Sequence, residues 1–226
     1  MRDQTLAKEV YDLLLDELIT WRLRPGDIIA EGRLAKRLGT SRTPVRESLK
    51  VLTEEGFLRV IPRTGYVVVP VTVADIHEVS HMRLLLESEA AALAAERMSQ
   101  DAIDKLRCCS EEVQRTASKQ QLAGQVYDYN AHFHLSIAYA SGNKRLAAAI
   151  EKLLKEEARV MFHDETVKDV DFVVGEHLKL LDVISTGEPK RARSAMRRHI
   201  EGHQERLLAS LSSEQVQIAI GSRAGR

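Results

Sequence analysis

The sequence predicts a mainly α-helical protein in two parts. The first is a small N-terminal module of three helices and a two-stranded hairpin, and the second is an all-α antiparallel helical bundle. Four of the five prolines lie within residues 1–70, whereas the rest of the chain contains long helix-forming stretches and almost no alternation typical of strands. We therefore place the module at residues 1–71, the bundle at 72–210 and a C-terminal tail at 211–226.

The charges of the chain balance overall but are unevenly distributed. The 226 residues include 33 basic and 33 acidic side chains, and 44% of the residues are hydrophobic. Residues 31–70 alone carry eight Lys or Arg against four acids, a local excess of four positive charges. A basic surface of this kind suits the binding of phosphate groups.

Nothing in the sequence indicates a membrane span or a secretory leader. No apolar run reaches the roughly 18 residues that a spanning helix needs. The only two cysteines, Cys108 and Cys109, are adjacent, a spacing that suits neither a mutual disulfide nor a zinc site and favours two reduced thiols. We therefore expect a cytoplasmic protein.

The helices of the N-terminal module follow from periodicity and from turn residues. Residues 5–20 carry an apolar stripe at helical spacing. The residues RPGD at 24–27 predict a turn, and the short helix predicted at 31–38 ends at Gly39, a residue typical of helix C-caps. A second helix is predicted within 40–56.

The helix within 40–56 has two distinct faces. Pro44 fits the first turn of a helix, where Ser41 or Thr43 can supply the cap. One face is apolar (Val45, Leu49 and Leu52) and another, about 100° away, is basic (Arg42, Arg46 and Lys50). Residues 57–71 alternate around a PRTG turn and predict the hairpin. The pattern fits a helix-turn-helix that enters a DNA groove, and also a small domain with a solvated basic face.

The stretch LAKRLGTSRTPVRESLKVLTEEGFLRVIPRTGYVV resembles the winged helix-turn-helix of the GntR family of bacterial transcription regulators. The resemblance implies binding of double-stranded DNA through phosphate and base contacts, and through a wing tip near the minor groove. It carries over the DNA-binding residues Ser41, Arg42, Thr43, Arg46 and Gly65. Several relatives have an arginine where Gly32 stands, so Arg33 is a further candidate at the next position.

The bundle begins with a predicted helix at 73–97 whose apolar stripe includes Arg83. An arginine is rarely buried without an anionic partner. Two interpretations stay open: a buried ion pair with Glu87 one turn later, or capture of a ligand carboxylate.

Histidines from three predicted helices face the core of the bundle. In YNAHFHLSI, at 129–137, Asn130 and His134 share the apolar face of a helix, whereas His132 lies on the polar face. His177 and His199 also have apolar neighbours at helical spacing in two later helices. The pattern fits hydrogen-bonded core histidines, and also convergence on one Zn²⁺ or Ni²⁺ ion.

Three further stretches, FHLSIAYASGN, GEHLKLLDVISTGEPKRA and the histidine of AMRRHIE, resemble the FCD domain of the FadR subfamily. Many such domains hold a divalent metal against which small organic acids or related metabolites bind. The carried-over metal ligands are Asn130, His134, His177 and His199, with Asn130 where the family often has Asp. Arg83 and Arg159 are then candidate effector ligands.

Together these inferences predict a homodimeric, metabolite-responsive repressor rather than an enzyme, with a pseudo-palindromic operator as its DNA target. Its cofactor would be a divalent metal, with Zn²⁺ as the first choice and Ni²⁺ or another divalent ion as alternatives. Two alternatives stay open. One is a metal-dependent enzyme acting on a small carboxylate, and the other is a regulator whose metal is purely structural.

Overall fold

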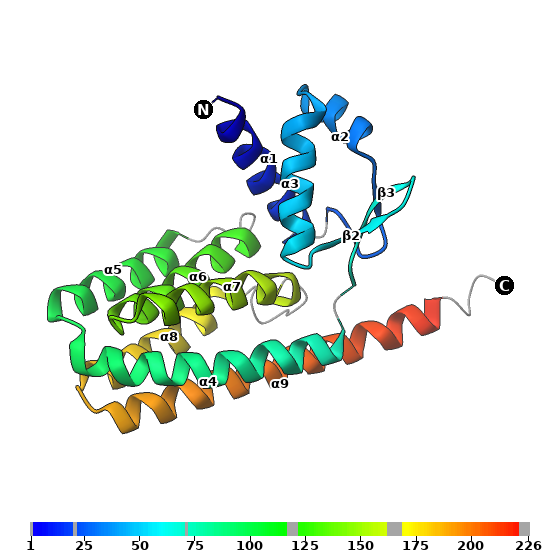
Figure 1. Cartoon of the computed structure of the whole chain (residues 1–226). Coiled ribbons are helices and arrows are strands. Elements are labelled where there is room, and N and C mark those ends of the chain that lie inside the picture. Colours follow the sequence, from blue (N-terminus) through cyan, green and yellow to red (C-terminus); the bar gives the residue numbers. More distant parts are fainter. Residues whose placement is uncertain (1, 20–21, 71, 117–121, 162–168, 222–226) are drawn as a thin grey trace. The chain divides into compact units, whose positions relative to one another are not determined.

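The computed structural model describes residues 2–19, 22–70, 72–116, 122–161 and 169–221. The chain divides into two compact units, Met1–Val71 and Thr72–Arg226, which are described separately below. The elements of the first unit are α1 (Arg2–Ile19), β1 (Ile28–Ile29), α2 (Glu31–Leu38), α3 (Arg42–Glu54), β2 (Leu58–Ile61) and β3 (Gly65–Val68) (Figure 1).

The first unit forms around the apolar face of α3. Val45, Leu49 and Leu52 are completely buried there, and they belong to one core cluster with Leu14 of α1 and Phe57. The turn between α2 and α3 uses Gly39, which ends α2 in the left-handed conformation at φ 63°. Ser41 is the N-cap residue of α3, but its side chain makes no capping hydrogen bond. The two helices and the turn between them match the predicted helix-turn-helix.

The sheet of this unit has three strands in the order β1-β3-β2, whereas the sequence predicted two. The additional strand β1 has only two residues, too few to show a period, and it pairs antiparallel with β3. Gly65 begins β3 at φ 135°, where an added Cβ would lie 2.3 Å from the carbonyl oxygen of Ile29. Glycine at this position therefore permits the close approach of β1 and β3.

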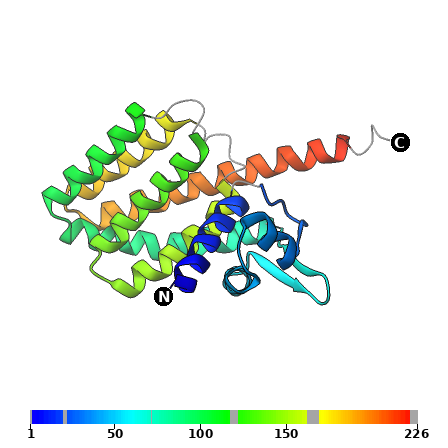
Figure 2. The same cartoon turned by 90° about the horizontal axis from the view of Figure 1, so that it is seen from above.

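The second unit is a bundle of helices. They are α4 (Val73–Arg97), α5 (Gln100–Thr116), α6 (Leu122–Ala140), α7 (Lys144–Met161), α8 (Val170–Ser185) and α9 (Pro189–Gly221). The two longest, α4 and α9, pack side by side (Figures 1 and 2). Residues 211–221, predicted as part of a tail, continue α9 instead. No helix in the described ranges is both long and apolar enough to span a lipid bilayer.

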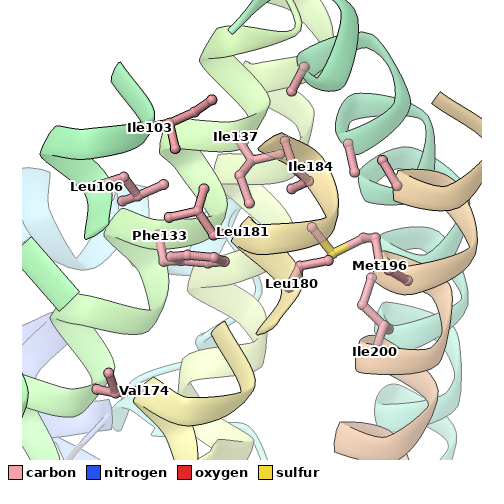
Figure 3. Packing of buried hydrophobic residues seen from close by; sticks show 14 of the residues in the cluster. Ile103, Leu106, Phe133, Ile137, Val174, Leu180, Leu181, Ile184, Met196 and Ile200 are labelled. Carbon is pink, nitrogen blue, oxygen red and sulfur yellow. The ribbon is translucent and has the colours of Figure 1, made fainter. Parts of the chain in front are cut away.

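The bundle core is built where α5, α6, α8 and α9 bring their apolar faces together (Figure 3). Its most deeply buried members include Phe133, Ile137, Leu181, Ile184 and Met196. Thr72 starts α4 with a capping box, in which its hydroxyl accepts from the backbone N–H of Asp75 and the Asp75 carboxylate accepts from the N–H of Thr72. These helices carry a second, polar group of buried residues that forms the candidate site.

Candidate functional site

The basic face of α3 is exposed, as a DNA-reading helix requires. All the predicted contact residues before the wing are solvent-exposed: Arg33, Ser41, Arg42, Thr43 and Arg46. The opposite face of α3 is buried, so these side chains point away from the core. Gly65 of the wing is half-buried because it also lies against β1.

Arg46 is held by a carboxylate in the neighbouring helix. Its Nε lies 3.1 Å from both carboxylate oxygens of Glu31, and its Nη2 lies 2.9 Å from Oε2. Tyr66 of β3 donates to the same carboxylate, at 3.3 Å. The hydrogen bonds to Arg46 lower the pKa of Glu31, and the same pair raises the pKa of Arg46. Glu31 thus ties together α2, α3 and the wing.

Arg42 occupies the space beside Gly32. A Cβ built on Gly32 would lie 3.3 Å from Nη2 of Arg42. In this chain the glycine leaves room for the guanidinium of Arg42 over the start of α2.

The bundle brings together the three histidines that the sequence placed on apolar faces. His134 of α6, His177 of α8 and His199 of α9 each offer a nitrogen within 4.8 Å of the others. Their ring centroids are 5.1 to 5.2 Å apart. Asn130 is buried one turn before His134, whereas His132 is exposed. The apparent His-x-His pair therefore divides into one inward and one outward side chain, as predicted.

The three clustered histidines are held in the neutral form. Burial lowers the pKa of His134, and it lowers the pKa values of His177 and His199 well below the ordinary range. The nearby charge of Arg83 adds to the effect at each ring. A neutral imidazole keeps a lone pair for a metal ion.

Glu87 of α4 fixes the orientation of His134. Its Oε2 lies 2.5 Å from Nδ1 of that ring. Burial opposes ionisation of Glu87, but the positive charge of Arg83 and the contact with His134 outweigh it and hold the pKa of Glu87 below its usual range. An ionised carboxylate only accepts, so Nδ1 carries the hydrogen and Nε2 bears the lone pair. This carboxylate–histidine arrangement is typical of metal-ligating histidines.

Two ring nitrogens of the histidine cluster lack a hydrogen-bond partner. Nε2 of His134 and Nδ1 of His177 are buried and have no hydrogen-bond partner in the described part of the chain. Buried polar atoms are normally satisfied, so bare nitrogens in a converging cluster fit ligands of a metal ion. Three imidazoles suit Zn²⁺ or Ni²⁺, and Asn130 is buried one helical turn before His134.

Arg83 lies within a buried network of charged groups. Its Nε donates to Glu87 Oε1 at 2.5 Å, and its Nη1 donates to Glu157 of α7. His203 Nδ1 lies 3.1 Å from Glu157 Oε1. The buried ion pair with Glu87, one of the two alternatives for Arg83, is therefore present. A role of Arg83 in binding an effector stays a prediction.

Glu157 and His203 belong to this site but were not among the predicted site residues. Glu157 follows Ile150 and Leu154 at helical spacing on the apolar face of α7, and a buried acid there is the signal that could have revealed it. The side chain of Arg159, the second predicted effector ligand, lies outside the described residues.

A winged helix-turn-helix with an exposed basic helix, followed by a helical domain with a buried polar centre, defines a DNA-binding transcription regulator of two domains. Two family models match the chain: bacterial regulatory proteins, gntR family, at residues 6–68, and the FCD domain at 78–202. The chain belongs to the gntR family of bacterial regulators and carries an FCD domain.

Relatives and solved structures agree with this assignment. The regulator McbR of Escherichia coli K12 is 31% identical over 153 residues, which cover 68% of this chain and 69% of McbR. A probable repressor of the D-xylose utilization operon of Paenarthrobacter nicotinovorans is 28% identical, covering 88% of this chain and 87% of the relative. The solved structure of E. coli McbR/YncC has the same fold, with a TM-score of 0.77 at 24% identity over 91% of this chain and 98% of that chain.

Proposed function

We propose that this regulator is a metabolite-responsive repressor whose bundle holds a divalent metal, Zn²⁺ or Ni²⁺, and binds a small organic acid against it. Asn130, His134, His177 and His199 would hold the metal. The observation that carries the proposal is the cluster of three converging histidines, in which His134 Nε2 and His177 Nδ1 are buried and have no hydrogen-bond partner in the described part of the chain. Three imidazoles alone leave the fourth position of tetrahedral Zn²⁺ open for a carboxylate, and with Asn130 also bound the carboxylate would make the ion five-coordinate.

The resident metal would supply a positive charge to which an acid can coordinate. The chain's own residues prepare the site. Glu87 orients His134 through Nδ1, and Arg83 in turn holds Glu87. His134 and His177 are buried, and a low-dielectric environment strengthens electrostatic binding of an anion.

Two further observations support repression by a dimer. A probable xylose-operon repressor and the repressor RspR of E. coli K12 are among the relatives. The apolar side chains Met82 and Leu85 are exposed on α4 and could pack against a second copy. A symmetric dimer would present two α3 helices to the two halves of a pseudo-palindromic operator.

The metal proposal is tested by the substitution His134→Ala. Elemental analysis of purified wild-type protein should find Zn or Ni, and the variant should lose it. His132→Ala is the matched control because it removes an exposed histidine from the same helix, and it should retain the metal. Equal metal content in His134→Ala and wild type would remove His134 from the site.

The effector proposal is tested by operator binding in the presence of small carboxylic acids. An effector shifts DNA affinity only by binding the two arrangements of the protein unequally. An acid that releases wild-type protein from its operator should fail to release His134→Ala. A metal-free variant that still responds to the acid would instead make the metal purely structural, and turnover of the acid would indicate an enzyme.

A further inference from the structure

One carboxylate oxygen in the bundle interior is left without a partner. Glu157 is 2% exposed. Its Oε1 accepts from Nη1 of Arg83 and lies 3.1 Å from His203 Nδ1, but its Oε2 has no hydrogen-bond partner in the described ranges. A buried, unpaired acceptor carries a desolvation cost, which a ligand bearing a donor would relieve.

Glu157 lies beside the histidine cluster, since it contacts His203, which follows His199 by one helical turn on α9. The guanidinium of Arg83 joins the two, because Nη1 donates to Glu157 while Nη2 lies 3.5 Å from His134 Nδ1. Glu157 is therefore one guanidinium away from a candidate metal ligand. A short molecule anchored by its carboxylate on a metal held by the histidines would extend toward Glu157 if it lay along Arg83.

The negative charge of Glu157 restricts which chemical group the ligand can carry at the end away from the metal. A plain alkyl chain would leave Oε2 unpaired. A second carboxylate would bring like charges together in a buried site, which is unfavourable. A hydroxyl group donates one hydrogen bond and adds no charge, so it matches the bare oxygen.

We propose that Glu157 accepts a hydrogen bond from a hydroxyl group of the effector, so that the pocket selects hydroxylated monocarboxylic acids over plain monocarboxylates and dicarboxylates. The inference rests on the proposed function, since it takes the acid carboxylate to be bound at the metal. It adds a specificity-determining residue and a narrower class of ligand.

Calorimetric titration of the metal-loaded full-length protein tests the selection without any substitution. The probes are butyrate, its monohydroxy derivatives, its monoamino derivatives and succinate. At least one hydroxybutyrate should bind about tenfold or more tightly than butyrate, as expected for a hydrogen bond to a charged acceptor. Succinate should bind no better than butyrate. Equal binding of butyrate and every hydroxybutyrate, or a preference for succinate or an aminobutyrate, would overturn the assignment.

The substitution Glu157→Gln tests the role of the carboxylate itself. The amide oxygen would keep the place facing Arg83, so the amide nitrogen would face the ligand as a donor. The advantage of the hydroxybutyrate should therefore shrink, and succinate should gain affinity relative to butyrate. A purely structural role of Glu157 would leave both ratios unchanged, and that result would contradict the proposal.

The control is Glu89→Gln, which neutralises an exposed carboxylate of α4 that pairs with Arg193. It should leave every ratio as in wild type. Metal content and thermal unfolding establish that each variant is folded and loaded, and if Glu157→Gln does not fold, the wild-type series still decides. If none of the acids binds the loaded protein, the proposed function fails together with this inference. If butyrate binds as tightly as its derivatives, only this inference fails.

Discussion

Arg46 in the DNA-reading module and Arg83 in the bundle each bind a glutamate, yet their surroundings are opposite. The side chain of Arg46 is 63% exposed and that of its partner Glu31 is 23% exposed. Arg83 and its two partners, Glu87 and Glu157, are at most 3% exposed. An exposed pair can exchange its partner for DNA at little cost. A buried network cannot lose one member without leaving an uncompensated charge.

The two units therefore use the same ion pair for different purposes. In the module, Glu31 orients an exposed arginine that is predicted to contact DNA. In the bundle, Glu87 and Glu157 hold Arg83 in the interior, and Glu87 fixes the orientation of a candidate metal ligand. Substitutions in the two units should consequently have separable effects on stability and on DNA binding.

The largest expected effect is the loss of stability caused by Arg83→Ala. Removing this guanidinium leaves Glu87 and Glu157 buried without their common cation, which should lower the free energy of unfolding by about 3–5 kcal/mol. Urea unfolding in the presence of a chelator measures it. The control Arg193→Ala breaks an exposed pair with Glu89 and should cost less than about 1 kcal/mol. Similar losses in the two variants would contradict the distinction drawn between buried and exposed pairs.

The second effect is the loss of operator affinity in Arg46→Ala. A bidentate contact between arginine and a guanine edge contributes about tenfold to hundredfold in affinity for the correct base. The variant should lose operator binding by at least this factor and keep the thermal stability and metal content of wild type. Arg22→Ala, which removes an exposed arginine paired with Asp16, is the control. Unchanged mobility shifts with Arg46→Ala would remove Arg46 from the recognition surface.

Regular periodicity made most of the fold predictable from sequence. On α3 the apolar side chains repeat about once per helical turn, and the basic side chains repeat in the same way on another face. The inward positions of His134, His177 and His199 follow from their apolar neighbours. The mainly helical architecture predicted from these patterns is confirmed, and so is the family of regulators that the resemblance of particular sequence stretches implied.

Long-range pairing and weak local signals were not predictable. Glu157 lies 74 positions from Arg83 along the chain, so nothing in the local pattern shows that they meet. Strand β1 has only two residues and exists because β3 passes beside it. Residues 211–226 show no clear role in the sequence and were predicted as a tail, whereas the backbone of α9 continues to Gly221.

The third effect is a decrease in stability of metal-free protein in mild acid. The pKa values of His134, His177 and His199 are lowered in the folded state. Below about pH 6.5 the unfolded chain binds protons that the folded chain does not, so stability must decrease as pH falls. The expected slope is about 1.4 kcal/mol per pH unit for each histidine.

Urea unfolding in the presence of a chelator, between about pH 6.5 and pH 5, measures the pH dependence of stability to which these histidines contribute. The stability that comes from the lowered pKa of Glu87 is lost only at lower pH. His177→Gln should reduce the slope of the free energy of unfolding against pH by about 1.4 kcal/mol per pH unit, the contribution expected of one histidine. An identical slope in this variant and in wild type would show that His177 does not titrate as the structure implies.

The smallest expected effect concerns Glu31, and it sharpens the comparison most directly. Glu31→Gln should raise the affinity for non-specific DNA by a few-fold, because Arg46 is released and one negative charge beside the phosphates is lost. Operator affinity should rise less, because the carboxylate also limits the orientations of the Arg46 guanidinium before its predicted base contact. The ratio of specific to non-specific binding should therefore decrease.

Glu54→Gln removes an exposed charge from the same module, at the end of α3, and should change both affinities in proportion. An equal rise in both affinities for Glu31→Gln would show that Glu31 only repels the DNA phosphates and does not position Arg46.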